Sequence, residues 1–160
     1  MTGEKRMPVE VKTTEAACVA YIPMTGPYEQ IPGAFRRLYG WVAQHGLRPA
    51  GMPSGVYLTD PARGGTPARW ELRAPLADDA ADAALDATGC GVKHLPPRLV
   101  AAAVYRGPYD GIAPAYAELA AWIRSNGYAV VGPPEELYLS EPATPPEETL
   151  TEIRFPVARM

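Results

Sequence analysis

The feature that most constrains this chain is an internal repeat with a period of 81 residues. Residues 10–76 align with residues 91–157 without a gap, and nearly a third of the 67 aligned pairs are identical. Ordinary residue usage would give about one identical pair in fifteen. The identical pairs include Gly26/Gly107, Tyr28/Tyr109, Trp41/Trp122, Tyr57/Tyr138 and Arg73/Arg154. The repeat predicts two copies of one folding unit, module 1 at about 10–76 and module 2 at about 91–157, joined by a linker at 77–90 in a single domain that spans 1–160.

Composition narrows the functional classes. The chain has 160 residues, of which 47% are hydrophobic and 21% charged, as in an ordinary globular domain. A net charge of −3 without a Lys/Arg run argues against direct nucleic-acid binding. The N-terminus lacks an apolar signal segment, and the longest apolar run, Leu99–Tyr105, is too short to cross a bilayer. We therefore expect a cytoplasmic protein with no membrane partner, either a monomer or a homodimer.

Each copy reads as strand–helix–strand–strand. An apolar run is followed by a Gly-Pro-Tyr-acid turn and then by apolar residues at spacings of three and four, which is typical of an amphipathic helix. The predicted helices are at about Tyr28–His45 and Tyr109–Asn126. The predicted strands are Ala17–Pro23, Ser54–Asp60 and Trp70–Leu76 in module 1, and Leu99–Tyr105, Glu135–Glu141 and Thr151–Val157 in module 2. Pro61–Arg69 and Pro142–Leu150 read as connections, and in the linker a short helix after Asp78 is one interpretation.

This order of elements predicts an α+β fold: two duplicated modules related by a pseudo-twofold axis, forming one antiparallel sheet with both helices on one side and a central ligand cleft. In the hairpins, Val56 and Leu137 are expected to face the helices. The alternate residues would then point away from the helices and line the cleft: Gly55 and Tyr57 in module 1, Glu136 and Tyr138 in module 2.

The site is expected where the copies differ. Glu136 corresponds to Gly55, so a carboxylate stands in one copy where the other has no side chain. A carboxylate flanked by Tyr57 and Tyr138 suits an apolar, often cationic ligand. Partial burial would also raise the pKa of Glu136 and fit it for general-base catalysis. Two other interpretations stay open: a solvated surface glutamate, and a structural ion pair with Arg154.

Other aromatic residues are candidate contacts. Tyr109 begins the second predicted helix, Tyr116 lies on its apolar stripe, and Trp70 is aligned with Thr151, so that only one copy has an aromatic residue there. Trp70 shares the parity of Leu72, which also fits a place in the core. The two cysteines and two histidines have no metal-binding spacing, and no Ser/His/Asp set or phosphate loop is present. We expect no cofactor and no metal.

On these motifs the chain resembles the GyrI-like small-molecule-binding domains, which also occur as effector-binding domains of AraC-type and MerR-type multidrug regulators. The resemblance is carried by the doubled Gly-Pro-Tyr-acid turns, by Glu136 within Glu-Leu-Tyr-Leu and by Thr151–Val157, and it covers about residues 8–158. It implies a standalone form, since the length leaves no room for a helix-turn-helix domain.

The resemblance implies three functions. The first is binding of apolar, cationic aromatic compounds, with Glu136 meeting the cation, as in the multidrug-binding members. The second is hydrolysis of cyclopropane rings in DNA-alkylating natural products, with Glu136 as general base and Tyr138 or Tyr109 as proton donor. The third is a gyrase-inhibitor-like role in protein interaction.

Overall fold

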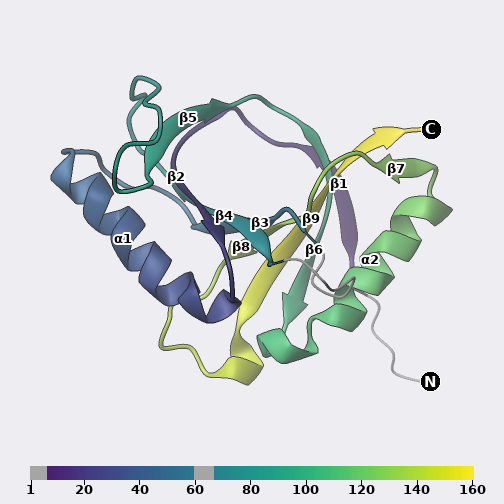
Figure 1. Cartoon of the computed structure of the whole chain (residues 1–160). Helices are drawn as coiled ribbons and strands as arrows, with labels where there is room; N and C mark the ends of the chain where they lie inside the picture. Colours follow the sequence, from purple (N-terminus) through teal and green to yellow (C-terminus); the bar gives the residue numbers. More distant parts are fainter. Residues whose placement is uncertain (1–6, 60–66) are drawn as a thin grey trace. The chain divides into compact units, whose positions relative to one another are not determined.

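The computed structural model describes residues 7–59 and 67–160 (Figure 1). It confirms the α+β class: two helices accompany strands whose described pairings are all antiparallel. The predicted connection Pro61–Arg69 and the end of the predicted strand at Asp60 lie largely outside the described residues. By its contacts the chain forms two compact units, which we call the first unit (Glu15–Pro97) and the second unit (Arg98–Met160 together with Met1–Thr14).

The first unit is a four-stranded antiparallel arrangement with one helix. Its elements are β2 (Ala17–Thr25), α1 (Ile31–Gln44), β3 (Ser54–Tyr57), β4 (Arg69–Pro75) and β5 (Gly91–Leu95). The strands pair in the order β3-β4-β2-β5. Helix α1 packs against β2 and β4, and the core between them is built around Trp70, Leu72 and Leu38.

The second unit repeats this plan. Its elements are β1 (Val9–Thr13), β6 (Leu99–Arg106), α2 (Ala113–Ser125), β7 (Tyr128–Val130), β8 (Glu135–Tyr138) and β9 (Leu150–Arg159). The strands pair in the order β1-β6-β9-β8, and the short β7 pairs with β9. Helix α2 packs against β6 and β7 over a core that includes Leu119, Ile123 and Ile153.

The copies in the sequence and the units in the structure differ by one strand. The repeat aligns Val11 of β1 with Val92 of β5, so these are the first strands of the two copies. Strand β1 pairs with β6, however, and β5 pairs with β2. Each copy's first strand therefore completes the sheet of the other copy, an exchange that the alignment alone does not reveal.

Both helices begin later than predicted. Tyr28–Gln30 and Tyr109–Gly111 form single 3-10 turns, and the α-helices follow them. A proline stands in the first turn of each α-helix, where its missing N–H costs no hydrogen bond. The helices end as predicted, before Gly46 (φ 68°) and Gly127 (φ 81°), whose left-handed conformation glycine adopts without strain.

The face predicted for the hairpin side chains is wrong. Gly55 lies opposite Leu72 and Tyr57 opposite Trp70, and directly opposed residues share a face of the sheet. Trp70 and Leu72 belong to the core under α1, so Gly55 and Tyr57 face the helix. In the second unit Glu136 lies opposite Ile153 and Tyr138 opposite Thr151, and Ile153 is in the core under α2.

The prediction from alternation failed because β3 and β8 carry buried residues on both faces. Val56, on the face away from α1, is only 3% exposed, and Ser54 on the same face is also buried. When neither face is open to water, alternation of polarity does not tell which face meets the helix.

The linker forms no helix in the structure. Asp78 pairs with Arg48, with 2.7 Å between Oδ1 and Nη2, and Ala83 makes an isolated antiparallel bridge with Val92.

Neither α1 nor α2, nor any other helix in residues 7–59 and 67–160, has the length and apolar character needed to cross a bilayer.

Candidate functional site

Glu136 is a buried carboxylate held by two tyrosine hydroxyls. It lies on β8, and its residue is 8% exposed. The hydroxyl of Tyr116, from α2, donates a short hydrogen bond to Oε2. The hydroxyl of Tyr138, two residues further along β8, donates to Oε1 at 3.3 Å. Both carboxylate oxygens thus have a neutral donor, one from the helix and one from the strand.

Three glutamates are buried in the described chain, and Glu136 differs from the other two. Glu71 accepts from Arg73 Nε and Lys93 Nζ, each at 2.7 Å, and Glu135 accepts from Arg98 Nη2 at 2.6 Å. For Glu136 the structure shows hydrogen bonds from hydroxyls and no salt bridge within the described residues. Burial raises its pKa, and the hydrogen bonds from Tyr116 and Tyr138 offset that rise only in part.

Aromatic rings surround this carboxylate within the second unit. Tyr109 and Tyr138 meet edge to face, with ring centroids 6.0 Å apart and planes at 87°. Tyr116 and Phe155 form a second edge-to-face pair at 5.8 Å. Tyr109 is 52% exposed, so an aromatic surface at this site is open to water. Such rings supply apolar contact area and, through their faces, attraction for cations.

The first unit repeats the aromatic pair without the acid. Tyr28 and Tyr57, which align with Tyr109 and Tyr138, also meet edge to face at 5.4 Å and 88°. Gly55 and Phe35 stand where the second unit has Glu136 and Tyr116. The carboxylate and its strongest hydroxyl partner therefore both belong to the second copy alone.

Trp70 is the anchor of the first unit's aromatic group. It is fully buried, its Nε1 donates to the carbonyl of Gly26 at 3.0 Å, and its ring lies 6.2 Å from that of Tyr28. Its predicted parity with Leu72 is confirmed, because both residues belong to the core. The sequence predicted Trp70 as a candidate ligand contact. In the structure its indole is packed in the core under α1.

The structure thus brings four predicted site residues together in the second unit and three in the first: Glu136, Tyr138, Tyr116 and Tyr109, then Gly55, Tyr57 and Trp70. The interpretation of Glu136 as a solvated residue is wrong, because it is buried. Arg154 lies opposite Glu135, and its Nε donates to Glu152 at 2.5 Å, so the structural pair with Glu136 is also wrong. Phe155, whose ring meets that of Tyr116, was not among the predicted site residues.

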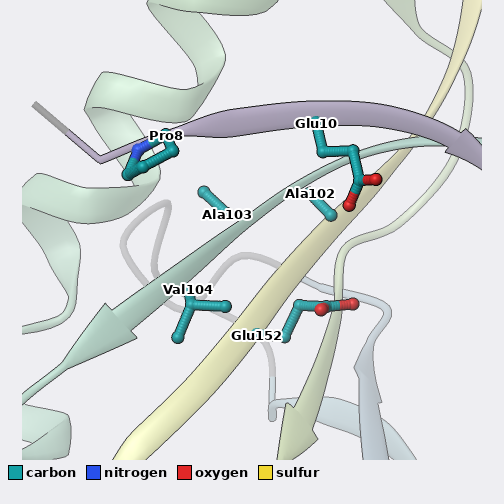
Figure 2. Close-up of a pocket in the computed structure, with 6 residues that line it drawn as sticks. All are labelled: Pro8, Glu10, Ala102, Ala103, Val104 and Glu152. Atoms are coloured by element: carbon teal, nitrogen blue, oxygen red, sulfur yellow. The ribbon is translucent and has the colours of Figure 1, made fainter.

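A shallow pocket of about 230 Å³ lies elsewhere in the second unit, on the opposite face of its sheet. Figure 2 shows its lining: Pro8 and Glu10 before and on β1, Ala102, Ala103 and Val104 on β6, and Glu152 on β9. None of the predicted site residues lines it.

The repeat explains this pocket. Ala102 aligns with Tyr21, and Glu10 aligns with Gly91. In the first unit Lys93 Nζ lies 4.2 Å from the centre of the Tyr21 ring. In the second unit the alanine has no ring at this position. Lys12 pairs with Glu152, as Lys93 pairs with Glu71, and it also pairs with Glu10. The hollow is the space that a tyrosine fills in the other copy.

Comparison with known families identifies the fold. A family model described as the GyrI-like small molecule binding domain matches residues 7–158. The chain belongs to this family. As a GyrI-like domain it is a small-molecule-binding protein, and the resemblance carried by the Gly-Pro-Tyr-acid turns and the Glu136 strand is confirmed.

Solved structures support the same fold. The C-terminal domain of EcmrR matches with a TM-score of 0.82 and 20% identity, covering 96% of this chain and 99% of that domain. The match to EcmrR in its complex with DNA covers 96% of this chain but only 58% of the EcmrR chain, so this chain spans little more than half the length of that protein. SAV2435 bound to tetraphenylphosphonium matches with a TM-score of 0.61 and 18% identity, covering 95% and 94% of the two chains. A hydrolase from Listeria innocua matches with a TM-score of 0.73 and 14% identity, covering 97% and 94%. No curated protein matches the sequence.

Proposed function

We propose that this GyrI-like domain binds apolar cations that carry aromatic groups, and that Glu136 supplies the countercharge. The observation that carries the proposal is the contrast among the buried glutamates: Glu71 and Glu135 are matched by Lys or Arg, whereas Glu136 is held by the neutral hydroxyls of Tyr116 and Tyr138. A buried carboxylate with a raised pKa gains most when a cation arrives beside it.

The surrounding rings fit the same ligand class. Tyr109 and Tyr138 present edges and faces beside the carboxylate, and Tyr109 is half exposed. A delocalised aromatic cation loses little hydration on binding and gains both dispersion and cation–π attraction. SAV2435, which shares the fold, has a solved structure bound to tetraphenylphosphonium, a compound of this class.

The test compares a cation with a neutral analogue. Tetraphenylphosphonium and triphenylphosphine oxide are titrated by calorimetry into the native chain and into Glu136→Gln. Loss of a charged interaction is worth about 1.5–3 kcal/mol, so the variant should bind the phosphonium roughly 10- to 150-fold more weakly. The neutral oxide should bind both proteins about equally, because the aromatic surface is unchanged.

The matched control is Glu135→Gln, one residue away on the opposite face of β8. Its carboxylate pairs with Arg98, on the face of β8 opposite to Glu136. Phosphonium affinity should survive this change. Equal affinity of native protein and Glu136→Gln for the phosphonium would overturn the proposal.

A second candidate function rests on the raised pKa of Glu136. A carboxyl group with an elevated pKa, flanked by hydroxyl donors, is suited to take a proton from water. Hydrolysis of a strained ring would use it as follows. The water oxygen bonds to one cyclopropane carbon, and Glu136 takes the water proton. The electron pair of the broken C–C bond passes to a carbonyl conjugated with the ring, and Tyr138 donates a proton to that oxygen.

The two functions predict different results for the same variant. With a neutral substrate that bears a cyclopropane ring, Glu136→Gln should bind normally but turn over about 10²–10⁴-fold more slowly. Mass spectrometry would detect the product as the substrate plus one water. A native protein that binds cations but leaves such substrates unchanged over hours would exclude this second function.

A further inference from the structure

Cys18 and His94 meet across two strands of the first unit. They lie directly opposite each other in the β2–β5 register, so their side chains share a face of the sheet. Asp79, in the segment that joins β4 to β5, reaches the same place. One donor atom from each of these three residues lies within 4.8 Å of the other two. Sequence spacing had predicted no metal site, because these residues are 15 to 76 positions apart and the strand pairing was unknown.

The imidazole is oriented by two carboxylates. His94 Nδ1 lies 2.5 Å from Asp82 Oδ1, and Nε2 lies 2.6 Å from Asp79 Oδ1. One ring nitrogen is thus held by Asp82, while the other faces Asp79 on the side of the thiol. Metal-binding histidines use this arrangement, in which a carboxylate on the second nitrogen fixes the ring.

The donor set points to a particular class of ion. Thiolate, imidazole and carboxylate together are ligands for Zn²⁺, whereas Ca²⁺ and Mg²⁺ prefer oxygen donors alone. Three protein ligands with a fourth position left to water form the open kind of zinc site. The side chains of Asp79 and His94 are 87% and 44% exposed, so an ion can reach them and the carboxylate is free to move toward it.

We propose that Cys18, Asp79 and His94 bind Zn²⁺, and that Asp82 positions the His94 ring for it. On binding, the ion replaces the contact between His94 Nε2 and Asp79, and the Cys18 thiol gives up its proton and its weak bond to the Ala80 carbonyl (3.7 Å). This site is separate from Glu136, which belongs to the second unit.

The repeat shows that the fold itself does not require these residues. The equivalent cross-strand pair in the second unit is Thr13 opposite Leu99, which carries neither thiol nor imidazole. The linker that supplies Asp79 and Asp82 lies outside the aligned residues 10–76 and 91–157. The ligand set therefore occurs in one copy only, and the second unit has Leu99 and Thr13 at the positions of Cys18 and His94.

Cobalt reports on such a site directly, because a Co²⁺–thiolate bond gives a charge-transfer band in the near ultraviolet. The full-length reduced protein is titrated with Co²⁺ and then with Zn²⁺. We expect one equivalent of Co²⁺ to bind with this band, Zn²⁺ to displace it stoichiometrically, and millimolar Mg²⁺ or Ca²⁺ to leave it unchanged.

Variants assign the ligands. Cys18→Ala should abolish the band, and Asp79→Asn and His94→Ala should each weaken Zn²⁺ binding at least tenfold. Asp82→Asn should keep the band but weaken binding by about 10- to 100-fold, the usual effect of losing an orienting carboxylate. The matched control is Cys90→Ala, which removes the other cysteine, a core residue 1% exposed.

Circular dichroism confirms that each variant is folded. Two results would overturn the proposal: absence of a charge-transfer band in the folded native protein, or persistence of the band in folded Cys18→Ala. A band lost in Cys90→Ala but kept in Cys18→Ala would show that Cys90, not Cys18, supplies the thiolate, and this result would also overturn the proposal.

Discussion

Glu135 and Glu136 are consecutive residues of β8, both less than a tenth exposed, and their charges are stabilised in different ways. Arg98 Nη2 donates to Glu135 at 2.6 Å on one face of the strand, whereas the hydroxyls of Tyr116 and Tyr138 donate to Glu136 on the other. The first carboxylate has a complete ion pair. The second keeps a capacity for positive charge that the protein's own described side chains do not use, and such groups are typical of binding sites.

Glu136→Gln should make the protein more stable at neutral pH. Burial holds the folded-state pKa of Glu136 above its ordinary value of 4.5. Between these two values the folded chain binds more protons than the unfolded chain, so the free energy of unfolding falls as pH rises through that window. Glutamine does not ionise and escapes this loss. We expect a gain of about 1 kcal/mol, or roughly 2–4 °C in Tm, at pH 7.

Thermal unfolding at two pH values checks this prediction. At pH 4 the carboxyl is mostly protonated in both states, so the advantage of the variant should largely vanish. Glu135→Gln should behave oppositely and lose about 1 kcal/mol at pH 7, because Arg98 is left without its carboxylate. A Glu136→Gln protein that is less stable than the native one at pH 7 would contradict the assignment of a costly buried charge.

Affinity for a cationic ligand should rise with pH. The cation favours the ionised form of Glu136, whose pKa is raised by burial. Below that pKa the affinity should fall, approaching about tenfold per pH unit. Calorimetric titration with tetraphenylphosphonium from pH 4.5 to pH 8 measures the curve, and the neutral triphenylphosphine oxide serves as the pH control. A flat profile for the phosphonium would show that Glu136 does not meet the charge.

Tyr116→Phe should shift this pH profile upward. The Tyr116 hydroxyl stabilises the ionised carboxylate, and its hydrogen bond lowers the pKa of Glu136 against the effect of burial. Without it the pKa should rise further, so that the midpoint of the phosphonium profile moves to higher pH. The ring is retained, and Phe35 at the equivalent position of the first unit shows that the fold accepts phenylalanine there. An unchanged midpoint would mean that the hydroxyl has no influence on Glu136.

The repeat in the sequence predicts much of this fold, and the reason is physical. Glycines that require a left-handed conformation, such as Gly46 and Gly127, and the apolar stripes of both helices recur in the two copies. Elements with strong local signals were therefore located to within a few residues. The strands β1 and β5 were missed, because each is short and pairs with the other copy's strand rather than with its own neighbour.

For the site, the difference between copies was informative and the alternation was misleading. The contrast between Glu136 and Gly55 singled out the buried carboxylate. The face of β8 that Glu136 occupies is set by its position opposite Ile153 in the β8–β9 register. That register depends on the geometry of the connection between the two strands, which the sequence does not predict. The cluster of Cys18, Asp79 and His94 could not be predicted for the same reason, since only the β2–β5 register brings the thiol and imidazole together.

The pocket in the second unit should be convertible into the filled arrangement of the first. Tyr21 lies opposite Gly91, and Ala102 lies opposite Glu10. A Cβ at Gly91 would lie 2.5 Å from the Ala83 carbonyl oxygen and 3.2 Å from Cε1 of Tyr21, so in the first unit the linker backbone and the tyrosine ring together leave room only for glycine. Ala102→Tyr alone should therefore cost about 1–3 kcal/mol through crowding against Glu10, and Glu10→Gly alone about 0.5–1 kcal/mol. The double variant should lose less stability than the two single losses added together, by at least about 1 kcal/mol, because Lys12 then lies over a ring, as Lys93 does over Tyr21.

Urea unfolding of the native protein, the two single variants and the double variant gives this coupling energy. Ala101→Tyr, in the core on the other face, is the control that Glu10→Gly should not rescue, and additivity of the first pair within about 0.5 kcal/mol would show that the two copies do not share this packing.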